Sequence, residues 1–155
     1  RATPISLTSI LGSKIAASIW RQVENLSLLM TAVAMLSMPL LISLYATAYP
    51  LQTYPLLSRV AMALGLVVSL LRLALEPFMI AAIGQAAGAA FPVRSTAVIT
   101  TAFLSAFYFL LINLARLIPL AWPLRFIVEF VLPVALPLLL TWASLRLTER
   151  LLTRN

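Results

Sequence analysis

Residues 78–108 read FMIAAIGQAAGAAFPVRSTAVITTAFLSAFY, two long apolar runs joined by the short segment Phe91-Pro92-Val93-Arg94-Ser95. Arg94 is the only charged residue between Glu76 and Arg116. A single charge at a tight turn between two such runs is typical of a chain that reaches the membrane surface and then re-enters the bilayer. We therefore predict a transmembrane helical hairpin.

Small residues gather in the first of these runs. Gly84 and Gly88 are spaced four residues apart, among alanines at positions 81, 82, 86, 87, 89 and 90. In lipid, this spacing lets two helix backbones approach closely, and van der Waals packing then holds the helices together. We expect Gly84 and Gly88 to be helix-packing positions, and the substitutions Gly84→Leu and Gly88→Leu to impair assembly.

The composition of the whole chain is that of a membrane protein. Hydrophobic residues make up 63% of the 155 residues and charged residues only 10%, whereas soluble domains carry about 25% charged residues. The sequence predicts an all-α polytopic transmembrane helical bundle that forms a single domain over residues 1–155. The net charge of +7 comes from basic residues at the ends of apolar runs, so we expect no nucleic-acid partner.

Side chains suited to catalysis or metal binding are scarce. The chain has no Cys, no His and no Asp, and Glu occurs only at positions 24, 76, 129 and 149. Disulfides, thiolate chemistry and imidazole ligation of haem or pigments are thereby excluded. We expect that the chain is not an enzyme, holds no metal, and binds no cofactor covalently or through His or Cys.

Residues 1–24 have the pattern of an amphipathic interfacial helix. Thr3-Pro4 is typical of an N-cap followed by proline at the first helical position. Apolar residues then recur at every fourth position, at Leu7, Leu11, Ile15, Ile19 and Val23. Lys14 and Arg21 lie off this stripe, as expected for a helix in the headgroup layer. Such a helix is either a simple lead into the first span or a docking helix for a cytoplasmic partner.

Four apolar segments in all, including the two of the hairpin, are long enough to cross a bilayer. We predict spans at about residues 26–48, 73–91, 97–115 and 126–145, with residues 60–71 as an interfacial segment or a helix extension. Four spans place seven basic residues on one side (Arg1, Lys14, Arg21, Arg94, Arg146, Arg150 and Arg154) and four on the other (Arg59, Arg72, Arg116 and Arg125). This asymmetry predicts a multi-pass protein of the cell (inner) membrane with both termini in the cytoplasm.

Two pairs of opposite charges, Arg72 with Glu76 and Arg125 with Glu129, have the four-residue spacing that allows ion pairing along a helix. Counting back about 20 residues from the turn at Pro92 places Arg72 near the opposite membrane interface, and the second pair falls on the same side. Two interpretations remain open. The pairs are either ion pairs at the membrane rim, or a substrate or proton site, because ionisable groups at membrane depth are costly and often functional.

Three segments together resemble the permease subunits of ABC-2-type ABC transporters. Thr3-Pro4-Ile5-Ser6, followed by Gly12 and Lys14, is similar to the cytoplasmic helix that precedes a span in that family. Ile83-Gly84 and Gly88, leading through Arg94-Ser95-Thr96-Ala97 into the next run, resemble the glycine-containing span and short turn of the family. The third segment is the final apolar span with its arginine-rich tail. The match covers about four of the six spans usual in that family.

The resemblance implies a permease half that dimerises and is driven by a separate cytoplasmic ATPase. Carried over by position, Thr3, Pro4, Ser6 and Lys14 would lie on the surface that contacts the ATPase, and Gly84 and Gly88 would lie in helix packing near the translocation path. The chain has no Walker-type phosphate-binding loop of its own, so nucleotide binding is expected only in the partner.

A second class of function fits the same features. A non-catalytic accessory or structural subunit of a large respiratory or photosynthetic membrane complex, including a repurposed permease relative, needs apolar helices and packing faces but no chemistry. Its partners would be other transmembrane subunits or a second copy, and the lipid bilayer. Bound lipid, quinone or carotenoid could lie against aromatic residues such as Phe91, Phe103, Phe107 and Phe109. A small proton-coupled exporter is disfavoured, because residues 26–48 contain no carboxylate.

Overall fold

The computed structural model describes residues 6–48, 52, 55–118, 120 and 122–154 as an all-α helical membrane bundle, as the composition predicts. The helices are α1 (Leu7–Trp20), α2 (Val23–Ala48), α3 (Pro55–Ala90), α4 (Arg94–Leu117), α5 (Trp122–Phe126), the π-helical turn η1 (Ile127–Val131) and α6 (Leu132–Arg154). Four stretches are long and apolar enough to cross a membrane: Val23–Thr47, Ser58–Ala90, Arg94–Ala115 and Leu124–Thr153. No strand occurs among the described residues.

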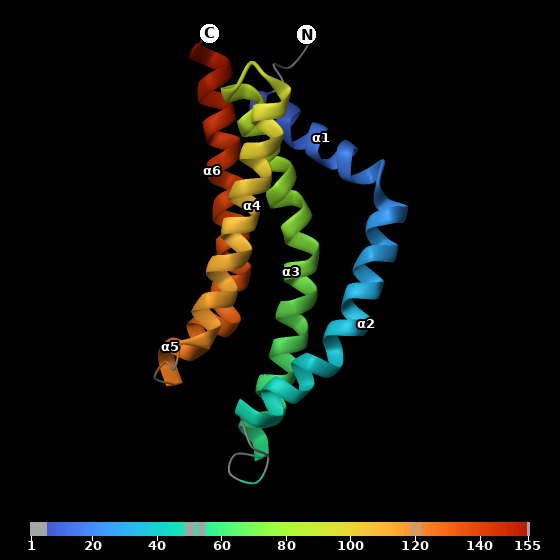
Figure 1. The fold of residues 1–155 in the computed structure, drawn as a ribbon, viewed down its shortest axis with the longest axis vertical. Helices are drawn as coiled ribbons and strands as arrows, with labels where there is room; N and C mark the ends of the chain where they lie inside the picture. Colours follow the sequence, from blue (N-terminus) through green and yellow to red (C-terminus); the bar gives the residue numbers. More distant parts are fainter. Residues whose placement is uncertain (1–5, 49–51, 53–54, 119, 121, 155) are drawn as a thin grey trace.

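α1 lies across one end of the bundle, between α2 and the other long helices (Figure 1). The structure begins α1 at Leu7, with Ser6 as the N-cap, whose hydroxyl oxygen accepts a hydrogen bond from the Ser9 N–H at 3.3 Å. The predicted cap Thr3-Pro4 lies outside the described residues. α1 packs on α3 and α6 through the buried side chains of Leu11 and Ile15. The apolar stripe of α1 therefore faces the bundle.

α2 stands apart from the bundle over most of its length. Tyr45 is the only buried residue among those of α2 with described side chains, and none of the most apolar part of the helix is buried. Figure 1 shows α2 diverging from α3 at the α1 end and bending toward α3 in its second half. Pro39 lies in that part of the helix and removes one backbone hydrogen bond, which is a common cause of a bend.

α3 is one continuous helix from Pro55 to Ala90. Residues 60–71 are therefore an extension of the predicted span 73–91 and not a separate interfacial segment. Pro77 lies inside α3 without ending it, as neighbouring helices allow in a membrane protein. The helix rises about 25 Å on either side of Arg72. Arg72 lies about 27 Å along the helix from Ala90, so its position near the opposite membrane interface stays a prediction.

The last part of the chain forms a second long helical stretch with a π-helical turn. Within η1 the backbone N–H of Leu132 donates to the carbonyl of Ile127, five residues earlier. α6 then continues to Arg154, beyond the predicted end of the fourth span near residue 145. Pro133 and Pro137 are fully buried where α6 packs along α3. Small, rigid proline side chains at this contact suit close helix packing.

Two apolar clusters hold the bundle together. One joins α3, α4 and α6 through Met79, Ile83, Tyr108 and Ile112, with Leu136 and Leu140 packed against them. The other joins the second half of α2 to α3 and η1 through Tyr45, Ala61, Val68 and Phe130. Tyr45 and Phe130 stack with ring centroids 5.9 Å apart. The result is a packed group of α3, α4 and α6, to which α2 is attached mainly at one end.

Candidate functional site

A groove with polar groups at its centre lies between α2 and the α3–α4 face. It consists of two adjoining parts of about 320 Å³ and 360 Å³, a size usual for small-molecule sites. Four residues line both parts: Val33, Leu73, Glu76 and Phe109. Apolar side chains of α2 and α3 supply most of the remaining wall, and residues of α1 close one end.

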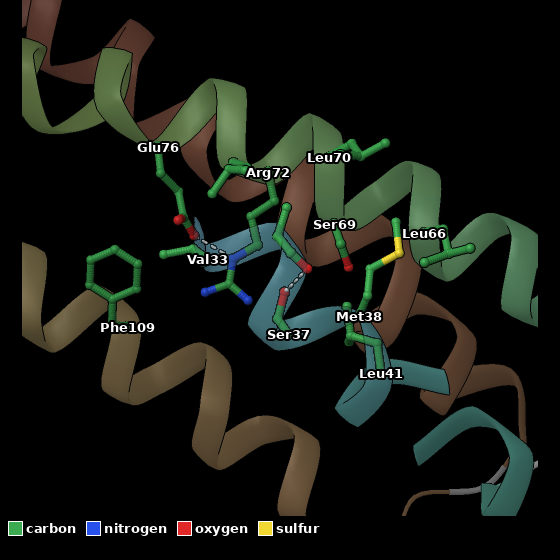
Figure 2. A pocket seen from close by; sticks show the side chains of 12 residues that line it. Val33, Ser37, Met38, Leu41, Leu66, Ser69, Leu70, Arg72, Glu76 and Phe109 are labelled. Atoms are coloured by element: carbon green, nitrogen blue, oxygen red, sulfur yellow. Dashed lines mark hydrogen bonds and ion pairs between the residues drawn. The ribbon is translucent and has the colours of Figure 1, made fainter. Parts of the chain in front are cut away.

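Arg72 and Glu76 form the polar centre of this groove (Figure 2). The Nε–H of Arg72 donates to Oε1 of Glu76, and the Tyr108 hydroxyl donates to the same oxygen at 3.2 Å. The guanidinium carbon of Arg72 lies 6.0 Å from the centroid of the Phe109 ring, within reach of a cation–π contact. The Arg72 and Glu76 side chains are only 15% and 14% exposed. Both charges are thus compensated inside the protein.

The position of this centre along the helices bears on its function. Arg72 lies midway along α3, and it faces Val33 and Ser37 near the middle of α2. A charged pair shielded from water must be satisfied by protein groups, whether it lies at the membrane rim or deeper. Tyr108 from α4 provides such a group. Both interpretations of the pair, an ion pair at the rim and a site, stay open.

Tyr108 is the site residue that the sequence reasoning missed. Its ring belongs to the apolar cluster between α3 and α4, and only its hydroxyl reaches Glu76. The signal available in the sequence is its spacing with Thr101, Ser105 and Ile112, which falls on one helical face of α4. Ser105 and Tyr108 are polar or amphipathic residues in a long apolar run, and buried tyrosine hydroxyls usually find a hydrogen-bond partner.

The second predicted pair, Arg125 with Glu129, is also formed, at 2.7 Å between Nε and Oε1. It belongs to α5 and η1, and neither residue lines the groove. Glu129 is buried while the Arg125 side chain is 39% exposed. The two pairs have the same spacing in the sequence but different surroundings in the structure. Arg72 and Glu76 line a groove, whereas Arg125 and Glu129 belong to α5 and η1.

The predicted packing glycines differ from each other in their surroundings. A Cβ added at Gly84 would meet Thr101 Cγ2 of α4 at 3.7 Å, an ordinary contact, and one added at Gly88 would meet nothing within 4 Å. The tightest approach is at Gly65 instead, where an added Cβ would lie 2.7 Å from Cζ of Tyr45. At Gly65, α3 therefore lies in close contact with Tyr45 of α2. Gly65 is an isolated glycine in an apolar run, and it was not predicted from the sequence as a packing position.

The residues predicted to contact an ATPase lie on or before α1. Thr3 and Pro4 are outside the described residues, Ser6 caps α1, and Lys14 is exposed on a side of α1 that does not carry Leu11 and Ile15. On the bundle side, Gln85 Nε2 of α3 donates to the Leu11 carbonyl at 3.5 Å. α1 therefore presents one face to the bundle and another away from it.

The described residues contain no group of three or more His, Cys, Asp or Glu side chains placed to hold a metal ion. The groove offers a set of hydrogen-bonding groups in an apolar wall, an arrangement suited to binding a small molecule. No family model, no curated protein and no solved structure matches the chain, so its likeness to ABC-2-type permeases stays a prediction from the quoted motifs.

Proposed function

We propose that the chain is the membrane subunit of an ABC-type transporter, similar to a permease and driven by a separate cytoplasmic ATPase. The observation that carries the proposal is the setting of α1, the helix in which the family resemblance begins. Its apolar residues Leu11 and Ile15 are buried against α3 and α6, while Lys14 remains exposed. A helix held in this way can receive a partner on its free side and transmit force to the bundle.

The connections of α1 suggest how such a force would act. Only Arg21 and Gln22 separate α1 from α2, so a displacement of α1 is passed directly to the end of α2. That end is not packed on α3, and the groove with Arg72 and Glu76 lies between them. Movement of α1 would therefore widen or narrow the groove. In this proposal both termini and α1 are on the cytoplasmic side of the cell (inner) membrane.

The second candidate function is a non-catalytic accessory subunit of a large membrane complex. It is favoured by the apolar surface of α2, where Leu28, Met35, Leu36 and Leu40 are each at least 70% exposed. Lipid covers such a surface in a lone subunit, and neighbouring transmembrane helices would cover it in an assembly. Redox or light-harvesting partners would then replace the ATPase.

Gentle purification of the native protein with mass spectrometry of its partners tests the proposal. We expect an ATPase subunit in stoichiometric amount, and we expect Lys14→Glu to reduce its recovery by reversing the charge on the free side of α1. Arg59→Glu is the matched control, because Arg59 is also exposed but lies near the start of α3. Recovery of redox or light-harvesting subunits without an ATPase would contradict the transporter proposal and support the second candidate.

A further inference from the structure

The groove opens sideways between α2 and α3. A wide, shallow hollow of about 960 Å³ continues it toward the outer surface, and four residues line both this hollow and the part around Arg72: Ala34, Met38, Leu70 and Leu73. The outer hollow is almost entirely apolar and includes Met35, which is 73% exposed. In a bilayer this opening faces acyl chains. A molecule that occupies the groove therefore reaches it from the lipid phase and has an apolar part that can remain in the opening.

The inner end of the groove offers hydrogen-bond donors. Nε of Arg72 is used by Glu76, and Figure 2 shows the two remaining guanidinium nitrogens directed away from Glu76, into the space between Phe109 and Ser37. Arginine donates hydrogen bonds and accepts none. The Ser37 hydroxyl donates to the Ala34 carbonyl at 3.3 Å, which leaves its oxygen as an acceptor. An occupant whose polar end carries an acceptor can therefore bind Arg72.

Charge balance decides which acceptor fits. The positive charge of Arg72 is already matched by Glu76, whose Oε1 also accepts from Tyr108. An added anion would leave a net negative charge in a medium of low dielectric constant, which is far more costly than adding a neutral group. The same charge balance disfavours the phosphate of a phospholipid headgroup. A neutral carbonyl oxygen avoids this cost.

We propose that this groove binds a neutral carbonyl-bearing lipid of the quinone class, with a ring carbonyl hydrogen-bonded to Arg72, the ring beside Phe109, and the tail in the lateral opening. A quinone has an uncharged polar end and an apolar tail, and it moves through the membrane interior. The proposal goes beyond the transporter function, because the site is formed by this chain alone and would equally serve an accessory subunit.

Binding to the purified whole chain in neutral detergent micelles tests this assignment, with isothermal titration calorimetry as the readout and protein-free micelles as the blank. The probe is a benzoquinone with a decyl tail, and decanoate is the anionic probe with a tail of the same length. We expect saturable binding of the decyl benzoquinone and an affinity for decanoate at least about tenfold lower. Equal or tighter binding of decanoate, or no saturable binding of the quinone, would overturn the proposal.

Variants of the groove residues test whether the quinone probe binds in the groove. Arg72→Met/Glu76→Met removes the donors while keeping the charge balanced, and we expect it to lower the quinone affinity about tenfold or more. The control Arg125→Met/Glu129→Met removes the other ion pair, outside the groove, and should leave the affinity unchanged. Ala34→Trp fills the groove from α2 without removing a polar group and should also weaken binding. Unchanged affinity in both groove variants would contradict the assignment, whatever the ATPase purification yields.

Discussion

At the scale of single residues, Glu76 connects α3 to α4 by accepting hydrogen bonds from Arg72 and Tyr108. We predict that Glu76→Leu lowers the free energy of unfolding by about 3–5 kcal/mol, because it leaves the buried Arg72 charge uncompensated. Tyr108→Phe removes one hydrogen bond to a charged group and should cost about 1.5–3 kcal/mol. Unfolding in mixed micelles measures both. If this explanation is correct, the double variant Arg72→Leu/Glu76→Leu loses less free energy of unfolding than Glu76→Leu alone.

Two glycines of α3 provide a matched comparison of packing. Gly65→Ala places a methyl group against the buried Tyr45 ring, which is stacked on Phe130, and overpacking of this kind costs about 1–3 kcal/mol. Gly88→Ala meets nothing within 4 Å, so the better helix propensity of alanine should make it neutral or stabilising by up to about 1 kcal/mol. Thermal unfolding of both variants in detergent measures the difference. Equal stability of the two variants would show that the Tyr45 ring moves aside without a loss of stability.

The sequence could identify the charged residues of the site but not their environment. The four-residue spacing correctly predicted the pairing partners of Arg72 and Arg125, because that spacing is a local property of a helix. It could not distinguish Gly65 from Gly88, since close approach depends on which side chain of another helix, here Tyr45, lies opposite. Tyr108 was missed for the same reason.

At the scale of elements, α1 is attached to the bundle through two buried side chains, Leu11 and Ile15. Leu11→Ala together with Ile15→Ala should weaken its contact with α3 and α6, since each truncation of a buried aliphatic side chain costs about 2–5 kcal/mol. We predict faster trypsin cleavage after Arg21, which is exposed at the end of α1. Ser13→Ala, on the exposed side, is the control. Unchanged cleavage in the double variant would mean that other contacts hold α1.

Helix existence was predictable from apolar length, but helix ends were not. The sequence left open whether residues 60–71 form an interfacial segment or a helix extension, and α3 continues through Arg72 and Pro77. The turn η1 depends on a hydrogen bond spanning five residues, from Leu132 to Ile127, and no residue pattern in this segment indicates it. Neither feature follows from the local residue pattern alone.

At the scale of the whole molecule, the start of α1, the α3–α4 turn and the end of α6 lie at one end of the bundle (Figure 1). Because the chain has no Cys, single introduced thiols can report sidedness without background. We predict that Ser6→Cys and Ser95→Cys react with a membrane-impermeant maleimide only after the cytoplasmic side is opened, whereas Gln52→Cys reacts in intact cells. Labelling of all three from one side would contradict a four-span arrangement.

The attachment of α2 near Tyr45 and Gly65 has a mechanical consequence. Measured along its bent axis, α2 extends about 33 Å from Tyr45 to its start at Val23. A rotation of about 5° around the Tyr45–Gly65 contact would shift the Val23 end by up to about 3 Å. In the proposed transporter the helix would act as a lever with its fulcrum at Tyr45, so that a displacement too small to disturb the stacked rings would change the width of the groove.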